Sequence, residues 1–331
     1  MGLQSYRVDE VIVIGSGNWG LALACLFAEK YPIRVWTLNE QIAEQLNASR
    51  QNPGKFFKHP IPDSIVVEPK YSSQFDETRT LIILAVPSGQ IALVSRELSS
   101  YTSRPLILSV AKGFDVERQC TMSGVIKGEL PGATVVVLSG PTIANEVAEG
   151  KPTRAVLACE DLTTLAMVKK ALANRVISLQ VSCNPAHHEI CAALKGIVAI
   201  AVGMAEALEM GCNAKGVIIT EGIKELAEVA AFFGIPQTAA YGISGSADLI
   251  ATCLSSDSRN VRLGRYLAEG NTLQQALDKV GMAVEGVAMS RTIETLLALD
   301  VSIPLIHFVN RAIQGGCRDI RAEIEGLIAV L

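Results

Sequence analysis

VIVIGSGNWG, residues 11–20, decides the fold of this chain. It opens with a β-branched apolar run without polar alternation, which is typical of a parallel strand buried on both faces. Gly15 then permits a tight turn, Gly17 lets backbone N–H groups approach a pyrophosphate, and Gly20 lets the next helix lie close to the sheet. Because a helix is expected at about 19–29, this GxGxxG predicts a dinucleotide site, with a purely structural glycine turn as the alternative.

The length and the order of apolar segments predict two domains. Up to about residue 181, strand-like runs alternate with helical stretches, and after Asn184-Pro185 only helical segments rich in Ala, Leu, Glu and Lys follow. We therefore expect an α/β Rossmann-type domain with a mostly parallel sheet at 1–184 and an all-α domain at 185–331, with a substrate cleft between them. The expected strands lie near 11–14, 33–37, 65–67, 81–85, 105–110, 134–138, 154–158 and 176–181.

Composition argues against several kinds of partner. The net charge of -4, with both signs scattered, disfavours nucleic acid. The cysteines form no CxxC pair and the histidines no HxxxH or HExxH pattern, so we expect reduced thiols and no metal site. The chain opens without a charged and apolar leader, which predicts a cytoplasmic protein. The apolar stretch at 190–210 contains Lys195, Glu206 and Glu209, so a buried helix is expected rather than a membrane span.

Ligands of open α/β sheets bind beyond the carboxyl ends of the strands. Candidate segments there are Gly15–Gly20, Val86-Pro87-Ser88, Lys112-Gly113 and Ser139-Gly140-Pro141-Thr142. Lys112 would reach an anionic substrate or, alternatively, would lie solvated at the surface. Hydroxyls and helix amides around Thr142 would bind polar groups or would only cap a helix.

Lys195 stands in the apolar run ICAALKGIVAIA, residues 190–201. Its helical neighbours at three and four residues are small and apolar, so its amine is desolvated unless it opens onto a cleft. Desolvation lowers the pKa of an amine, and a nearby phosphate or carboxylate raises it again. We interpret Lys195 as a proton donor for carbonyl reduction, and the alternative is a lysine whose amine extends to the solvent.

Two further segments contain polar groups that suit a small anionic substrate. Asp248 follows a Gly/Ser-rich stretch at 242–246, which is expected to be flexible, and is predicted either to cap a helix or to hold substrate hydroxyls or Lys195. Ser258-Arg259-Asn260 is interpreted as a phosphate-binding group or as a surface turn. Hydrolase chemistry has no support, because no serine lies in a GxSxG pattern.

Together these segments resemble the NAD(P)-dependent glycerol-3-phosphate dehydrogenases of the bacterial type. SGPT, LKG and DLxxTC with SRN occur in that order, which is far more specific than GxGxxG alone. The matching segments are GSGNWGLALA at 15–24, AKG at 111–113, SGPTIANEVAEGKPT at 139–153, ALKGIVAIAVGMAEAL at 193–208, NAKGVIITEGIKE at 213–225, and ADLIATC followed by SRN at 247–260.

The resemblance implies reversible reduction of dihydroxyacetone phosphate to sn-glycerol 3-phosphate for phospholipid synthesis, a helical domain like that of 6-phosphogluconate dehydrogenase, and a homodimer. By similarity, Lys195 would be the general acid in reduction and the base in the reverse direction. The implied substrate contacts are Lys112, Gly140, Thr142, Lys195, Asp248, Thr252, Ser258, Arg259 and Asn260. The implied NAD(P) contacts are Gly15, Gly17, Asn18, Trp19, Gly20, Lys112, Ala144, Arg259, Ala283 and Glu285.

The chain departs from the family pattern at three places. Gly196 stands where many relatives have asparagine, Glu221 where bacterial relatives commonly have arginine, and Ser246-Ala247 where Leu-Gly is usual. The end of the second strand, VWTLN at 35–39, contains neither an acidic residue for NAD nor an arginine for NADP. The alternatives are a two-domain reductase of the hydroxyacid or ketopantoate type and a dinucleotide sensor without turnover.

Overall fold

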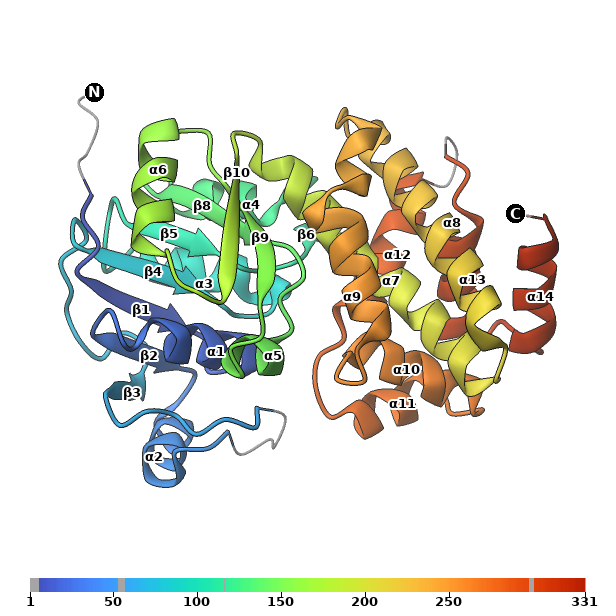
Figure 1. Ribbon diagram of the computed structural model, residues 1–331, viewed down its shortest axis with the longest axis horizontal. Helices are drawn as coiled ribbons and strands as arrows, with labels where there is room; N and C mark the ends of the chain where they lie inside the picture. The colour runs from blue at the N-terminus through green and yellow to red at the C-terminus, as the bar shows by residue number, and fades with distance from the viewer. Residues whose placement is uncertain (1–5, 53–56, 116, 298–300, 331) are drawn as a thin grey trace. The chain divides into compact units, whose positions relative to one another are not determined.

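The computed structural model describes residues 6–52, 57–115, 117–297 and 301–330. The chain forms two compact units. The first comprises Met1–Ala111 and Arg118–Ala186, and the second comprises Lys112–Glu117 and His187–Leu331. Figure 1 shows the first unit as strands and helices coloured from blue to green, and the second as helices that run to red at the C-terminus.

Within the described residues, the first unit contains an eight-stranded sheet of order β10-β9-β8-β5-β4-β1-β2-β3. All neighbouring strands are parallel except β8 and β9, which are antiparallel. The expected strands and the mostly parallel sheet are therefore confirmed. The strands are β1 (Glu10–Ile14), β2 (Ile33–Thr37), β3 (Ile65–Pro69), β4 (Thr80–Leu84), β5 (Leu106–Ser109), β8 (Thr134–Ser139), β9 (Thr153–Ala158) and β10 (Ile177–Ser182).

Helices cover both faces of this sheet. Val11 and Val13 of β1 face one apolar layer, and Ile12 and Ile14 face the other, as the period of two in a strand requires. The first layer includes residues of α1 and α6, and the second includes residues of α3 and α4. The helices are α1 (Asn18–Phe27), α2 (Glu40–Ser49), α3 (Ile91–Leu98), α4 (Met122–Glu129), α5 (Ala144–Ala148) and α6 (Leu162–Ala171), with a 3-10 turn η1 (Ser88–Gln90). The structure also contains two short strands that were not predicted, β6 (Phe114–Asp115) and β7 (Cys120–Thr121).

The order of the strands places a topological switch between β1 and β4. From β1 the chain proceeds to β2 and β3 on one side, and from β4 it proceeds to β5 and β8 on the other. The carboxyl ends of β1 and β4 lead into Gly15 and Ala85. Ligands of open α/β sheets bind at such a point, so the fold places the glycine motif where a cofactor is expected.

Beyond residue 186, the described elements of the second unit are helical, which confirms the predicted helical C-terminal part, and the segment 112–117 adds the two-residue strand β6. The helical elements are α7 (Pro185–Ala207), α8 (Gly211–Phe232), the 3-10 helix η2 (Gln237–Tyr241), the π turn η3 (Ile243–Ala247), α9 (Asp248–Leu254), α10 (Arg259–Ala268), α11 (Leu273–Val280), α12 (Glu285–Leu297), α13 (Pro304–Ile313) and α14 (Ile320–Val330).

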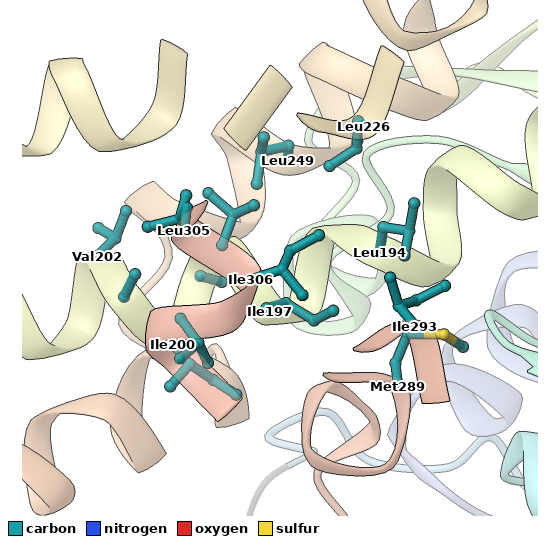
Figure 2. Packing of buried hydrophobic residues seen from close by; sticks show 14 of the residues in the cluster. Leu194, Ile197, Ile200, Val202, Leu226, Leu249, Met289, Ile293, Leu305 and Ile306 are labelled. Carbon is teal, nitrogen blue, oxygen red and sulfur yellow. The ribbon is translucent and has the colours of Figure 1, made fainter. Parts of the chain in front are cut away.

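The core of the second unit is built around α7. Leu194, Ile197 and Ile200 of α7 lie among buried side chains of other helices, including Leu249 of α9 and Ile306 of α13 (Figure 2). The helix is long and apolar enough to cross a membrane, and 83% of its most apolar window is buried inside the protein. The burial expected for the apolar stretch at 190–210 is confirmed, because side chains of the same unit cover it.

The Gly/Ser-rich stretch differs from the flexible link expected at 242–246. It forms the regular π turn η3, in which Ser244 and Gly245 are buried. A side-chain carbon on Gly245 would overlap with the carbonyl of Ala240, so the backbone of the turn packs directly against η2. Glycine occurs here because two backbone segments approach closely, and this reason is not visible in the local sequence.

A buried carboxylate joins α8 to the start of α13. Pro304 begins α13 and has no backbone N–H, and Ile303 before it provides no side-chain cap. The next two amides, of Leu305 and Ile306, donate to the carboxylate of Glu225 on α8 at 2.6 and 2.9 Å. Burial raises the pKa of Glu225 to about 7, although both hydrogen bonds oppose that shift. Glu225 therefore caps α13 from a neighbouring helix.

We predict that Glu225→Ala lowers the free energy of unfolding by about 2–5 kcal/mol, because it leaves two buried N–H groups without an acceptor. Urea unfolding followed by circular dichroism measures the change. The matched control is Lys224→Ala, which removes an exposed side chain of the same helix and is expected to change the free energy of unfolding by under about 1 kcal/mol. Equal stability of the two variants would contradict the capping role of Glu225.

Candidate active site

The glycine motif forms a turn that larger residues would disturb at two of its three positions. Gly15 has a φ of +115°, and a Cβ there would lie 2.6 Å from the carbonyl oxygen of Ala85. A Cβ on Gly20 would overlap with the carbonyl oxygen of Gly15. Gly17 differs, because no heavy atom lies within 4 Å of the place its Cβ would take. Gly15 and Gly20 are thus required by the fold, and Gly17 leaves a space open.

That open space lies at the N-terminus of α1, and it fits the pyrophosphate of a dinucleotide. Gly17 is the N-cap of this ten-residue helix and provides no side-chain cap. The first amides of a helix and its dipole favour an anion at this end. Asn18 follows, and its Oδ1 accepts a hydrogen bond from Asn52 Nδ2 at 3.0 Å. Trp19 is half-buried and packs against the core of the sheet. Backbone amides and an uncovered face thus occur together at the predicted site.

The segment Ser139–Thr142 begins with the last residue of β8 and leads into a turn of the first unit. Gly140 has a φ of +136°, a conformation that other residues rarely adopt. The hydroxyl of Thr142 donates to the carbonyl of Gly140 at 3.1 Å, within the same turn. Ala144 then begins α5, which packs against α1. The structure thus brings Ala144 close to the helix that follows the glycine motif.

In the second unit, the carboxylate of Asp248 binds two ammonium groups. Its Oδ1 accepts a hydrogen bond from Lys195 Nζ at 2.5 Å, and its Oδ2 accepts one from Lys112 Nζ at 2.8 Å. The side chain of Asp248 is 2% exposed, while those of Lys195 and Lys112 are 13% and 16% exposed. A buried carboxylate is tolerated because two cations compensate it. The structure thus places Asp248 in contact with Lys195, which is one of the alternatives that the sequence left open.

Three separate elements build this Lys112–Asp248–Lys195 cluster. Lys195 lies in the middle of α7, Asp248 is the first residue of α9, and Lys112 lies in the short segment 112–117 that follows β5 and belongs to the second unit. Thr252 lies one turn after Asp248, and its hydroxyl donates to the Asp248 carbonyl at 2.7 Å. Thr252 therefore shares the helix face of Asp248.

Burial among apolar side chains lowers the pKa of Lys195 below its ordinary 10.5. The charge of Lys112 lowers this pKa further, whereas the carboxylate of Asp248 raises it. Desolvation is the largest of these effects, because the charged ammonium loses its water shell on α7. The cluster therefore contains a lysine that gives up its proton more readily than a solvated lysine.

Ser258-Arg259-Asn260 begins α10 and is therefore a helix start rather than a surface turn. The hydroxyl of Ser258 accepts the N–H of Val261 at 3.3 Å and caps the helix. Arg259 Nη1 donates to the carbonyl of Ala283 at 2.7 Å, and Asn260 Oδ1 accepts the N–H of Gly286 at 3.3 Å. The structure thus brings Arg259 together with Ala283, two residues before Glu285.

Gly196 connects this group with Lys195. A Cβ on Gly196 would lie 3.0 Å from the Cα of Gly286 and 3.1 Å from Asn260 Nδ2. The side chain of Asn260 therefore lies beside the residue that follows Lys195, so Lys195 and Arg259 come from adjoining segments of one unit. A side chain at 196 would therefore meet the backbone of α12, so α7 and α12 lie in close contact at this glycine.

Sequence reasoning missed a hydrogen bond between the partly buried His188 and the buried Ser244. His188 of α7 and Ser244 of the π turn form a hydrogen bond of 2.7 Å between Nδ1 and Oγ. One sequence signal was present, because His188 precedes Lys195 by seven residues and so shares its helix face. Among the described residues, no group of three or more His, Cys, Asp or Glu side chains is suited to a metal ion.

Comparison with known proteins decides the family. The model described as the NAD-dependent glycerol-3-phosphate dehydrogenase N-terminus matches residues 10–165, and the model for the C-terminus matches residues 185–322. The chain belongs to this family. The glycerol-3-phosphate dehydrogenase (NAD(P)+) of Fusobacterium nucleatum is 36% identical over 308 residues, which cover 91% of each chain.

Solved structures agree with this assignment. The glycerol-3-phosphate dehydrogenase of Coxiella burnetii has a TM-score of 0.90 and 26% identity, and the match covers 97% of this chain and 99% of that one. A ketopantoate reductase from Ralstonia eutropha has a TM-score of 0.60 with 14% identity, over 96% and 99% of the two chains, which shows a shared fold alone. The predicted family, enzyme class and cofactor are confirmed: the chain is an NAD(P)-dependent oxidoreductase.

We predict that Gly17→Ala weakens NADPH binding at least about tenfold, because the new methyl group occupies the space where backbone amides approach the phosphates. The fold tolerates this change, since Gly17 has a φ of -71° and nothing lies within 4 Å of the added carbon. Fluorescence titration with NADPH measures the dissociation constant. Gly128→Ala, at an uncrowded glycine of α4 outside the candidate ligand segments, is the control and should bind as the unmodified protein does. Unchanged binding by Gly17→Ala would exclude this place as the phosphate site.

Proposed function

We propose that this chain reduces dihydroxyacetone phosphate to sn-glycerol 3-phosphate and that Lys195 is the proton donor. The observation that carries the proposal is the pair of ammonium groups, Lys195 and Lys112, on the buried carboxylate of Asp248 in a member of this family. When bound, the reduced nicotinamide supplies the hydride that the carbonyl carbon receives. The cofactor is NAD(P), in keeping with the family.

Lys195 suits proton transfer to a ketone oxygen. During reduction, negative charge develops on that oxygen, and a nearby ammonium group stabilises it and then donates the proton. Desolvation lowers the pKa of Lys195, which favours release of the proton, and Asp248 holds the resting lysine in its charged form. In the reverse direction the neutral amine accepts the proton of the substrate hydroxyl.

The charge of the cluster suits an anionic substrate. Two ammonium groups and one carboxylate leave one positive charge in a chain whose overall net charge is -4. Both amines keep some exposure, while the carboxylate is almost fully covered. A cation in a partly desolvated place attracts anions more strongly than one in water. Lys112 is therefore proposed to hold the substrate while Lys195 donates the proton.

Arg259 and Asn260 are proposed to bind the substrate phosphate. A guanidinium has five N–H donors in a planar fork, and Arg259 directs one nitrogen to the carbonyl of Ala283. Both residues lie in the first turn of the ten-residue helix α10, where the helix dipole favours anions. The remaining proposed substrate contacts are Gly140, Thr142, Asp248, Thr252 and Ser258, and the proposed cofactor contacts are Gly15, Gly17, Asn18, Trp19, Gly20, Lys112, Ala144, Arg259, Ala283 and Glu285.

The cellular assignments rest on chemistry and on the family. Glycerol 3-phosphate is the backbone of glycerophospholipids, so we propose a role in phospholipid synthesis in the cytoplasm. Absence of stable membrane insertion is proposed because 83% of the most apolar window of α7 is covered by the protein itself. A homodimer and the absence of a nucleic-acid partner are proposed from the family resemblance and from the charge.

We expect Lys195→Ala to lower turnover at least about 100-fold, because the developing alkoxide loses its proton donor. The assay mixes the purified protein with dihydroxyacetone phosphate and NADH or NADPH and follows the loss of nicotinamide absorbance. The dissociation constant of NADPH should stay the same within error. Lys224→Ala is the matched control and keeps full activity, since Lys224 is exposed and bonds only to Glu221 of its own helix in the described structure. Unchanged turnover in Lys195→Ala would refute the role of this lysine.

The pH dependence should differ between the two directions. Reduction requires the charged lysine, so its rate falls as pH rises through a midpoint below 10.5, while the rate of oxidation rises over the same interval. Because Asp248 raises this pKa and Lys112 lowers it, Asp248→Asn should move the midpoint to lower pH and Lys112→Met to higher pH. Profiles of kcat/KM against pH in both directions measure these shifts. Midpoints that stay fixed in both variants would contradict the assignment to Lys195.

A further inference from the structure

The carboxylate of Asp248 is placed by an unusual stretch of backbone. Asp248 directly follows the π turn η3, and its own N–H donates to the carbonyls of Ile243 and Gly245. These two residues flank Ser244, which is 1% exposed. A π turn is less favourable than an α turn and persists where surrounding contacts hold it, often at functional sites. A shift of Ser244 would therefore move both carbonyls to which the backbone of Asp248 is bonded.

His188 supplies a contact that holds Ser244. The His188 Nδ1 and Ser244 Oγ atoms lie 2.7 Å apart, and His188 belongs to α7, the helix that also carries Lys195. The two residues are seven positions apart, which is about two turns and roughly 10 Å along one face of the helix. The same two segments are thus joined twice, once by His188 and Ser244 and once by Lys195 and Asp248.

The chemistry of His188 suits a positioning contact. Burial lowers the pKa of His188 to about 4, with a smaller contribution from His187, so the ring is neutral at neutral pH. A neutral imidazole has one donor and one acceptor nitrogen and bonds a hydroxyl in either tautomer. It adds no cation that would compete with Lys195 and Lys112 for Asp248. The bond therefore fixes position without changing the charge of the cluster.

We propose that His188 is a positioning residue for the reaction: through its hydrogen bond to Ser244 it holds the π turn that places the Asp248 carboxylate between Lys195 and Lys112. The proposal rests on the function of Lys195 given above. Without the bond, the turn can relax toward an α turn, which moves the carboxylate relative to an amine on another helix. A displacement of about 1 Å at a reacting group is enough to slow catalysis about 100-fold.

The test uses the full-length enzyme and five variants. His188→Phe keeps a ring of similar size without a hydrogen bond, Ser244→Ala removes the hydroxyl, and the double variant removes both partners. His188→Asn places an amide near the position of Nδ1 and is the conservative rescue. His187→Phe is the matched control, because His187 takes no part in the bond to Ser244. Circular dichroism and the thermal midpoint identify any variant that fails to fold.

We expect His188→Phe and Ser244→Ala each to lower kcat about 10- to 100-fold, with little change in KM, since misplaced supporting groups typically cost this much. The double variant should lose no more than either single one, because both remove the same contact. His188→Asn should recover most of the rate, and His187→Phe should match the unmodified enzyme. The alkaline midpoint of reduction should move to lower pH in both single variants, because Asp248 then stabilises the charged Lys195 less.

A second measurement does not depend on turnover. In protein with 13C-labelled lysine side chains, the signal of Lys195 is identified by its loss in Lys195→Ala, and its titration is followed by NMR. His188→Phe and Ser244→Ala should both lower the measured pKa of Lys195, and His188→Asn should restore it. A merely structural role would lower the thermal midpoint and leave this pKa and the alkaline midpoint unchanged.

The outcomes separate this proposal from the proposed function. If Lys195→Ala is fully active, the proton donor is wrong, whatever the His188 variants do. Suppose instead that turnover depends on Lys195, and that His188→Phe and Ser244→Ala both fold. If these two variants then have the same kcat and the same pKa of Lys195 as the unmodified enzyme, the positioning role is overturned. Losses that add in the double variant would also overturn it, because they would mean that His188 and Ser244 act independently.

Discussion

The burial of one carboxylate constrains most of the second unit. Asp248 is almost fully covered, and a charge taken out of water is stable only if other charges or hydrogen bonds compensate it. Its compensation requires a lysine in the middle of an apolar helix and a second lysine from a segment far away in sequence. Each of those lysines is in turn desolvated and depends on Asp248. The three side chains therefore stabilise one another, and the two helices and the segment 112–117 that present them must keep their relative positions.

The fold was largely predictable because it depends on local patterns. Short β-branched runs identified the strands, and GxGxxG located the turn between β1 and α1. The antiparallel pairing of β8 and β9 was not predictable, since the composition of a strand does not encode its direction. The two-residue strands β6 and β7 were missed because so short a segment has no period to detect.

The candidate site was predictable where the polarity of one residue differs from that of its neighbours in sequence. Lys195 was identified because burying a charged side chain in an apolar helix is unfavourable unless a partner compensates the charge. Asp248 left two interpretations open, and only the three-dimensional arrangement shows its two partners. His188 shares a helix face with Lys195, but its hydrogen bond to Ser244 could not be predicted, because the two residues are 56 positions apart. Gly196 was identified only as a departure from the family pattern, and its close contact with the backbone of α12 is visible only in the structure.

Because residues 112–117 belong to the helical unit, a single cut in the chain cannot separate the two units. The backbone leaves the sheet after β5, contributes Lys112 to the unit that holds Asp248, and then returns for α4 and β8. A recombinant fragment that starts at His187 would lack Lys112. Only Lys195 of the two lysines would then compensate the carboxylate of Asp248. A chimera that takes only residues 187–331 from a relative would likewise combine the counterpart of Asp248 from that relative with the Lys112 of this chain.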